Sequence, residues 1–500
     1  MTRATLRPIV LLALTAMLTG CAARQTPAPA PAVVQADPLP AAPRPAGLLV
    51  VDVAALIAHG CFSCLERALA AARQQDDPAL AFEAAALLTL RAKELGLPHD
   101  RWMEQAIALA GDDPGRRLIF EMVDALPVDI LAGNRDAMPI QGPRRLRADP
   151  RFAEWLAALK GPPGSPALRT YVHLALSCAS DAVRKPDEIA AAVADTVRDL
   201  PIIRYRLGAC SNDHVVVLRT LRAADSEFVD ADYALARYAV QLRPHPDLDE
   251  AARLLRSASA AFPQSAAIAT TAGDVYQLID AWPEALAAYD ATLALVSGHP
   301  DALIGRTVSL SHLRQHEPAI ATATRLIDGS RWFVGQAFYW RAWNQFQLTN
   351  YPVARADADR ARSLLVSPAV YLLSGLIDWR LQRLESAEHE FEEALKIDFG
   401  ECEAALFLGH VRTERTRAPE AIAAFKQATQ CYDLNITLRR TLVADLEAAD
   451  ATPAYKAREI GRHQRGIEEA ERRRAEAQNG ADLLQKYLTS IQSPPRSPRP

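Results

Sequence analysis

The sequence predicts an all-α protein whose helices stack into an α-solenoid. The chain is rich in Ala, Leu, Arg and Glu, which are residues that favour helices. Its glycines stand mostly between helical patterns and seldom within alternating, strand-like ones. From about residue 232 onward an alanine recurs at a nearly constant interval, which indicates that the helices repeat.

The interval is measured on one alanine in each of six similar segments, among them DEAARLL, PEALAAY and PEAIAAFKQA. The six alanines are Ala251, Ala285, Ala319, Ala354, Ala387 and Ala421. Their spacings are 34, 34, 35, 33 and 34 residues. This period resembles that of the tetratricopeptide repeat, a helix-turn-helix unit that stacks on its neighbours into a superhelix.

Further positions share this period. In the first helix of each unit the resemblance implies a small residue, where two helices cross closely. Ala239, Gly273, Ala342, Gly375 and Gly409 fit, and Thr307 departs. Four residues after the recurring alanine the pattern has a bulky side chain. Leu255, Tyr289, Phe391 and Phe425 fit, whereas Ala323 and Ala358 depart. We therefore expect six repeats over residues 231–435.

The segments on either side predict more helices. Residues 48–230 are expected to form degenerate, repeat-like helical hairpins, interrupted by Pro-rich breaks. Residues 436–490 predict capping helices, first a charged helix and then a short final one, because a solenoid needs a polar end. Residues 491–500 predict a disordered tail.

The first residues predict an export signal, because two arginines precede an apolar run that is too short to cross a membrane. The following LTGC resembles the lipobox of bacterial lipoproteins, which implies cleavage after residues 1–20 and a lipid on Cys21. In lipoproteins of that family, an Asp directly after the lipidated cysteine retains the protein in the inner membrane. This chain has Ala22 at that position. We therefore expect anchoring to the periplasmic face of the outer membrane. The rest of the Pro/Ala-rich segment 21–47 predicts an extended tether.

An even number of cysteines follows Cys21, as a disulfide framework in an exported protein would leave. They are Cys61, Cys64, Cys178, Cys210, Cys402 and Cys431. Cys402 and Cys431 fall at the start and end of the last predicted hairpin, where antiparallel helices bring them side by side. A disulfide between Cys178 and Cys210 is then expected by elimination. For CFSC at a predicted helix start we expect a local disulfide, with thiol redox chemistry as the alternative.

The sequence offers no catalytic motif. Its histidines do not cluster with carboxylates at ligand spacing, and G-x-S-x-G, P-loop, H-E-x-x-H and Rossmann patterns are missing. The 56 basic and 60 acidic side chains nearly balance, so nothing indicates a nucleic-acid surface. We therefore expect that the protein is not an enzyme and that it has no cofactor and no metal site.

The segment AFYWRAWNQF, residues 337–346, has aromatic side chains at five of its ten positions, although only 6% of the chain is aromatic. The repeat resemblance places a stripe of these and later residues on the concave face. The stripe comprises Tyr339, Trp343, Phe346, Leu372, Leu376, Trp379, Leu406 and His410. Repeats of this family bind an extended peptide or a partner helix in that groove, which suits an apolar, aromatic lining. The protein's own C-terminal helix could fill the groove instead, or the rings could form plain core.

These features predict a non-catalytic, lipid-anchored envelope protein that acts as an interaction scaffold or assembly factor, with a protein or peptide partner. Two other classes stay open. A thiol-redox accessory protein would use Cys61 and Cys64, and a carrier of a small apolar ligand would use the concave face. Neither the partner nor the oligomeric state is indicated by the sequence.

Overall fold

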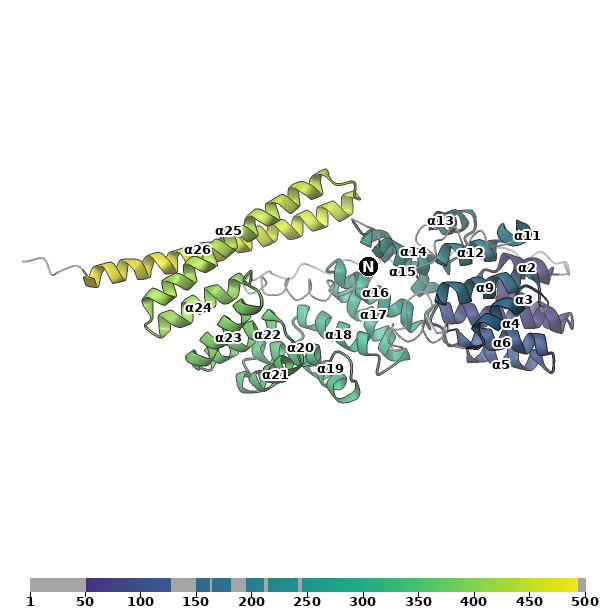
Figure 1. Ribbon diagram of the computed structural model, residues 1–500, viewed down its shortest axis with the longest axis horizontal. Helices are drawn as coiled ribbons and strands as arrows, with labels where there is room; N and C mark the ends of the chain where they lie inside the picture. Colours follow the sequence, from purple (N-terminus) through teal and green to yellow (C-terminus); the bar gives the residue numbers. More distant parts are fainter. Residues whose placement is uncertain are drawn as a thin grey trace, which may run out of the picture. The chain divides into compact units, whose positions relative to one another are not determined.

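The structure is a computed structural model that describes residues 51–126, 150–161, 164–180, 195–210, 215–241 and 245–492. The described chain forms two compact units, which we call the N-terminal unit (51–344 with 451–455) and the C-terminal unit (345–450 with 456–492) (Figure 1). Within the described ranges every regular element is a helix, as predicted. The signal peptide, Cys21, the tether and nearly all of the predicted tail lie outside these ranges.

The N-terminal unit begins with a group of helices that includes the apolar helix α4. They are α2 (Val53–His59), α3 (Phe62–Gln74), α4 (Pro78–Glu94), α5 (Asp100–Ala110), α6 (Pro114–Ala125), α8 (Phe152–Ala158), α9 (Pro166–Ser180), α11 (Asp195–Arg198), α12 (Pro201–Cys210) and α13 (Val215–Ala224). Asp52, Asp77 and Asp113 cap α2, α4 and α6 by accepting backbone N–H groups of the first turn. Helix α4 is buried from Ala81 to Glu94, so it forms the centre of this part of the core.

Helix α4 also carries charges into that core. Arg91 forms an ion pair with Asp230, and Glu94 pairs with Arg206 at 3.2 Å. The Tyr171 hydroxyl donates a hydrogen bond to Glu94 at 2.8 Å. All five residues are fully buried. Since removing one partner of a buried ion pair leaves the other charge uncompensated, these pairs tie α4 to the helices around it.

Paired helices follow from residue 231 at the predicted positions. The N-terminal unit holds α14 (Ala231–Gln241), α15 (Leu248–Ala261), α16 (Ala266–Leu278), α17 (Trp282–Leu295), α18 (Pro300–His312), α19 (His316–Gly329) and most of α20 (Val334–Gln347). The C-terminal unit holds α21 (Tyr351–Leu364), α22 (Pro368–Arg380), α23 (Leu384–Ile397), α24 (Cys402–Glu414), α25 (Ala418–Ala448) and α26 (Pro453–Gln492). The order of helix-turn-helix units confirms the predicted solenoid class.

Packing inside these hairpins confirms the small-against-bulky pattern. All six recurring alanines are fully buried. A Cβ built on the first-helix glycine of three hairpins would lie only 2.5–2.6 Å from a ring carbon of the second helix. The pairs are Gly273 with Tyr289, Gly375 with Phe391, and Gly409 with Phe425. Glycine is therefore required at these crossings, because any side chain would displace the ring.

The turn inside the hairpins repeats as well. One residue in each of five turns, none of them glycine, has a left-handed backbone with φ between 58° and 62°. These residues are Asp280, Arg314, Thr349, Gln382 and Thr416, and they are again 33 to 35 positions apart. The next backbone N–H donates to the carbonyl five residues earlier at 2.9 Å in every case. This is the Schellman pattern of helix ends, which satisfies carbonyls that the helix leaves unpaired.

The C-terminal helices differ from the prediction. Helix α25 has 31 residues and runs past the expected repeat boundary at residue 435, and α26 is one helix of 40 residues. The prediction of a charged helix followed by a separate short one was therefore wrong. Helix α26 continues through Gly480, where the Phe425 ring occupies the space of a side chain, 2.9 Å from a built Cβ. Among the described helices none is both long and apolar enough to cross a membrane.

Candidate functional site

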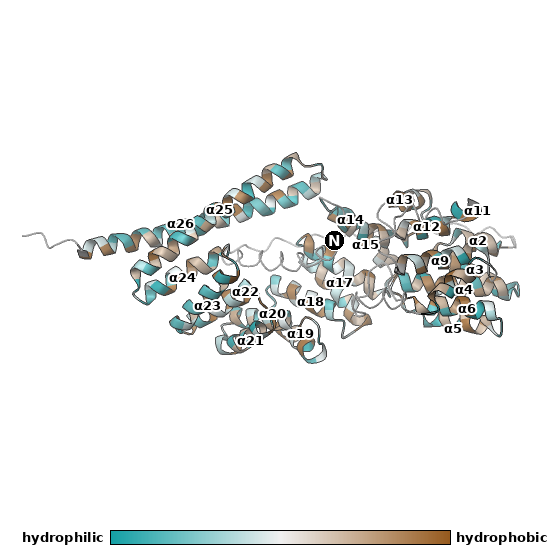
Figure 2. Ribbon diagram, viewed as in Figure 1, coloured by the Kyte–Doolittle hydropathy of each residue, from teal (hydrophilic) through white to brown (hydrophobic). Residues whose placement is uncertain are grey.

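Helix α26 packs against α24 in the C-terminal unit, on the face that was predicted to be concave. Figure 1 shows it running alongside α25, and Figure 2 shows that it is mainly hydrophilic. Its small residues Ala470, Ala477 and Ala481 belong to the same buried cluster as Leu406 of α24. His410 Nε2 lies 2.9 Å from the carboxylate oxygen Oε1 of Glu476 on α26. The last repeat is thus filled by the protein's own C-terminal helix, which was one of the predicted alternatives.

A buried carboxyl lies at this contact. Glu403, on the first turn of α24, is only 8% exposed. Burial raises the pKa of Glu403 to about 8, against the opposing attraction of Arg473 on α26. The carboxylates of Glu469 and Glu476, on the same helix, raise this pKa further. The contact between α24 and α26 therefore holds a carboxyl that is protonated at neutral pH.

Two of the predicted groove positions on α22 are only partly covered. Leu376 and Trp379 are half-buried. The Trp379 indole donates a hydrogen bond to Glu414 at 2.9 Å, and its ring stacks on His410 with centroids 5.9 Å apart. Trp379 is thereby held in a fixed orientation beside the region that α26 covers.

Three residues of the predicted groove stripe are buried. Tyr339 is 3% exposed and packs edge-to-face on Trp340, and Leu372 is fully enclosed with Leu408 of the next hairpin. Leu406 lies beneath α26. Neighbouring helices cover these three side chains, which fits the predicted alternatives of plain core or a groove filled by the chain's own helix and leaves no surface for a partner at these positions. The other residues of the predicted groove stripe are half-buried, and partner binding by them stays a prediction. They are Trp343, Phe346, Leu376, Trp379 and His410.

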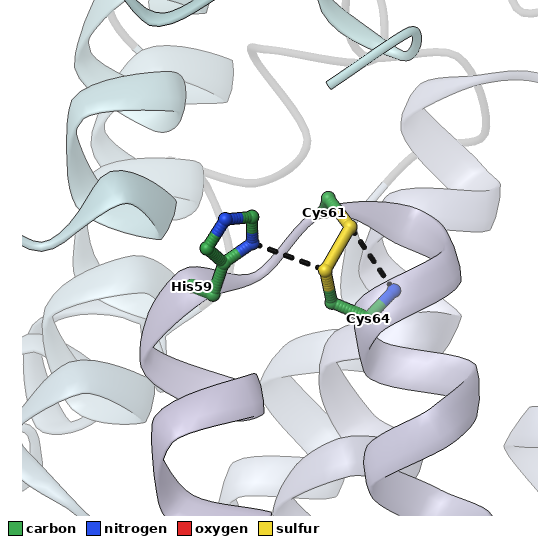
Figure 3. A group of neighbouring side chains, drawn as sticks. All are labelled: His59, Cys61 and Cys64. Atoms are coloured by element: carbon green, nitrogen blue, oxygen red, sulfur yellow. Dashed lines mark hydrogen bonds between the residues drawn. A yellow bond between two sulfur atoms is a disulfide. The ribbon is translucent and has the colours of Figure 1, made fainter. Parts of the chain in front are cut away.

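CFSC forms a second candidate site, where α2 meets α3 (Figure 3). Gly60 turns the chain with φ +73°, and Cys61 is the N-cap of α3. The predicted disulfide between Cys61 and Cys64 is present. The Cys64 backbone N–H donates to Cys61 Sγ at 3.1 Å. Both cysteines are buried, which shields the disulfide from attack by the thiol of another protein.

Polar groups converge on these two sulfurs. His59 Nδ1 lies 3.0 Å from Cys64 Sγ, and its Nε2 lies 2.5 Å from a carboxylate oxygen of Asp225. Glu227 Oε2 lies 3.6 Å from Cys61 Sγ and 3.3 Å from Cys64 Sγ. Asp225 and Glu227 follow α13, more than 160 residues along the chain from the cysteines. Sequence spacing gives no signal for such an approach, so this site was missed.

The other cysteines agree with the predicted pairing where the structure describes them. Cys402 and Cys431 form a disulfide with Cα atoms 5.4 Å apart. It joins the first turn of α24 to α25, as the antiparallel hairpin requires. Cys178 is also disulfide-bonded, while the side chain of its predicted partner Cys210 lies outside the described part.

Comparison with known proteins gives similarity at the level of repeats. No protein-family model and no curated protein matches the sequence. Among solved structures, YrrB, described as a TPR protein with an unusual peptide-binding site, is 18% identical over 36% of this chain and 93% of its own, with a TM-score of 0.32. A tetratricopeptide repeat protein from Parabacteroides merdae is 16% identical over 49% and 98%, with a TM-score of 0.33. PilW, a widely conserved type IV pilus biogenesis factor, is 11% identical over 47% and 96%, with a TM-score of 0.34. At these scores the similarity assigns no function to this chain.

Proposed function

We propose that this protein is a non-catalytic interaction scaffold, which holds a helical partner segment on the concave side of its C-terminal unit. The contact between α26 and α24 carries this proposal. In this contact Leu406 supplies apolar surface beneath the small alanines of α26, and His410 forms a polar contact with Glu476. A face that accepts a helix from its own chain has the shape and chemistry to accept a similar helix from another.

The binding surface in this proposal lies on α22, next to the covered position. Leu376 supplies aliphatic area and Trp379 supplies a large ring that Glu414 already orients. Large rigid side chains of this kind dominate binding energies because little side-chain entropy is lost when they are covered. The matching partner is an amphipathic helix with small or aliphatic residues on one side, as in α26.

The proposal places the scaffold in the bacterial envelope. The lipobox-like LTGC supports lipidation of Cys21, and the Pro/Ala-rich segment 21–47 supports a tether that lets the helical units stand away from the membrane. Ala22 supports the outer membrane. Such a position suits an assembly factor that meets other envelope proteins.

The test is photo-crosslinking in cells of the native host. A photoreactive amino acid replaces Trp379 in one strain and Val366 in a matched strain. Val366 is 85% exposed in the turn between α21 and α22, so it controls for surface access alone. We expect a defined crosslinked partner from position 379, with the yield reduced at least about tenfold by an added Leu376→Ala change. Equal crosslinking from both positions would refute the proposal.

The other two classes predicted from the sequence have less support. A thiol-redox accessory protein needs an accessible sulfur, whereas Cys61 and Cys64 are 0% and 1% exposed. A carrier needs an apolar cavity, and the concave positions of α24 are occupied by α26. We therefore propose neither.

A further inference from the structure

We propose that Cys61 and Cys64, once reduced, bind one Zn²⁺ ion together with His59 Nδ1 and Glu227 Oε2. The sequence predicted no metal site, because the carboxylate comes from a distant part of the chain. His59, Cys61 and Cys64 each offer a ligand atom, and these atoms lie within 4.8 Å of one another. Figure 3 shows the imidazole directed at the sulfurs across the turn between α2 and α3.

The distances fit a tetrahedral zinc site. With bonds of about 2.0–2.3 Å, neighbouring ligand atoms in such a site are roughly 3.5 Å apart. Three of the six ligand pairs already have separations of 3.0, 3.3 and 3.6 Å; these are Cys64 Sγ with His59 Nδ1, Cys64 Sγ with Glu227 Oε2, and Cys61 Sγ with Glu227 Oε2. Two changes are needed: the two sulfurs separate to about 3.7 Å after the disulfide opens, and Glu227, which is outside the group of ligand atoms within 4.8 Å of one another, moves closer to His59 Nδ1.

Glu227 supplies a carboxylate within reach of an ion bound by the two sulfurs. In the disulfide neither sulfur has a proton to donate, and Glu227 Oε2 is held 3.3–3.6 Å from them by its ion pair with Arg67. A cation between the carboxylate and the two sulfurs would be coordinated by all three groups. Cys61 and Cys64 have the C-x-x-C spacing of zinc ligands, and thiolate, imidazole and carboxylate are ligands that zinc accepts.

Asp225 and Arg67 complete the site as groups that do not bind the ion. Asp225 holds His59 Nε2 at 2.5 Å, which fixes the proton on that nitrogen and leaves Nδ1 as the electron-pair donor. Two thiolates, one carboxylate and Zn²⁺ together carry one negative charge. The Arg67 guanidinium, 3.3 Å from Cys64 Sγ and 2.6 Å from Glu227, neutralises that charge. Asp225 and Arg67 are positioning residues.

Reduction of the disulfide and binding of zinc balance in electrons and protons when a dithiol is the reductant. The reductant gives two electrons and two protons to the Cys61–Cys64 disulfide and itself becomes a disulfide. Zn²⁺ then displaces the two thiol protons and forms two metal–sulfur bonds, so binding releases two protons. The disulfide and the zinc complex are alternative states of the same two sulfurs.

The test uses the full folded chain, reduced under anaerobic conditions and titrated with Co²⁺, which reports coordination in its visible spectrum. We expect one tightly bound Co²⁺ per chain with tetrahedral d–d bands and a thiolate charge-transfer band, displaced by Zn²⁺. The Cys61→Ser/Cys64→Ser variant loses the charge-transfer band. The matched Cys402→Ser/Cys431→Ser variant keeps it, which separates this site from the thiols of the Cys402–Cys431 pair.

Two variants at side chains that are not buried keep the test independent of folding. Glu227 is 47% exposed, so Glu227→Ala leaves the fold intact and changes the d–d bands as one ligand is replaced by water. Asp225→Asn keeps the spectrum and weakens binding about 10- to 100-fold, as expected of a group that orients a ligand. A reduced wild-type chain without the charge-transfer band would overturn the proposal. So would a band that persists in Cys61→Ser/Cys64→Ser, or thiols that exchange with dithiols without binding Co²⁺.

Discussion

The buried carboxyl of Glu403 predicts that the C-terminal unit loses stability as the pH rises. Its pKa is about 8 in the folded protein, against an ordinary value of 4.5. At acidic pH the carboxyl is protonated in both the folded and the unfolded chain. Between these two pKa values the unfolded chain ionises and the folded chain does not, so ionisation favours unfolding. Stability is therefore lost from about pH 4.5 up to about pH 8.

The magnitude follows from the difference between the two pKa values. Each unit corresponds to about 1.4 kcal/mol, so the full difference is worth roughly 3–5 kcal/mol. Glu401, whose pKa burial raises to about 7, adds a slope of the same sign. The variant Glu403→Gln isolates one group, because the amide keeps the shape of the protonated carboxyl and does not ionise.

The assay is urea unfolding followed by circular dichroism at several pH values, with hydrogen exchange of α26 as a local readout. We expect equal stability of wild type and Glu403→Gln near pH 4. The variant then gains about 1.4 kcal/mol per pH unit relative to wild type, and is roughly 3–5 kcal/mol more stable above pH 8. An unchanged difference between the two proteins across this range would refute the assignment of a buried, protonated Glu403.

Three more predictions concern the two units. Gly375→Ala places a Cβ 2.5 Å from the Phe391 ring and should lower the free energy of unfolding by about 1–3 kcal/mol in a denaturant titration. Glu94→Ala leaves Arg206 buried without its 3.2 Å partner and should cost about 3–5 kcal/mol by the same method. Burial lowers the pKa of His312 to about 4, so its imidazole signal in NMR should stay constant down to about pH 5, and stability should fall as the pH drops from 6.5 towards 4.

Matched controls accompany these changes. A Cβ at Gly329 meets no atom within 4 Å, so Gly329→Ala should be neutral or stabilising; an equal loss in both glycine variants would contradict the ring-contact explanation. Glu66 pairs with Arg101 on the surface, and Glu66→Ala should cost less than about 1 kcal/mol. A His312 titration midpoint near 6.5 would show that this imidazole is solvated.

The repeats were predictable because each one is a local pattern. The position of Gly375 relative to Ala387, and of both to Phe391, lies within one hairpin, so the sequence carries the packing rule directly. The bridge between Cys402 and Cys431 was predictable for the same reason, since both cysteines belong to one antiparallel pair.

The sites were less predictable because their contacts are distant in sequence. Nothing local to CFSC shows that Glu227 comes within 3.6 Å of its sulfurs. The repeat resemblance implies a concave position for Leu406, yet it gives no sign that α26 covers that residue. The pattern after residue 435 predicted a charged helix and a separate short one, and it gave no sign that Gly480 lies inside a continuous α26 against the Phe425 ring of another helix.

The left-handed turns of the hairpins have a consequence for how the number of repeats can change in evolution. Asp, Arg, Thr and Gln all occur at the turn position with nearly the same φ, so the hairpin imposes this conformation and the residue only tolerates it. A block of about 34 residues taken between two such turns begins and ends in the same backbone state. Duplication or deletion of a block would therefore lengthen or shorten the solenoid without a new kind of joint, while α26 continues to close its final hairpin.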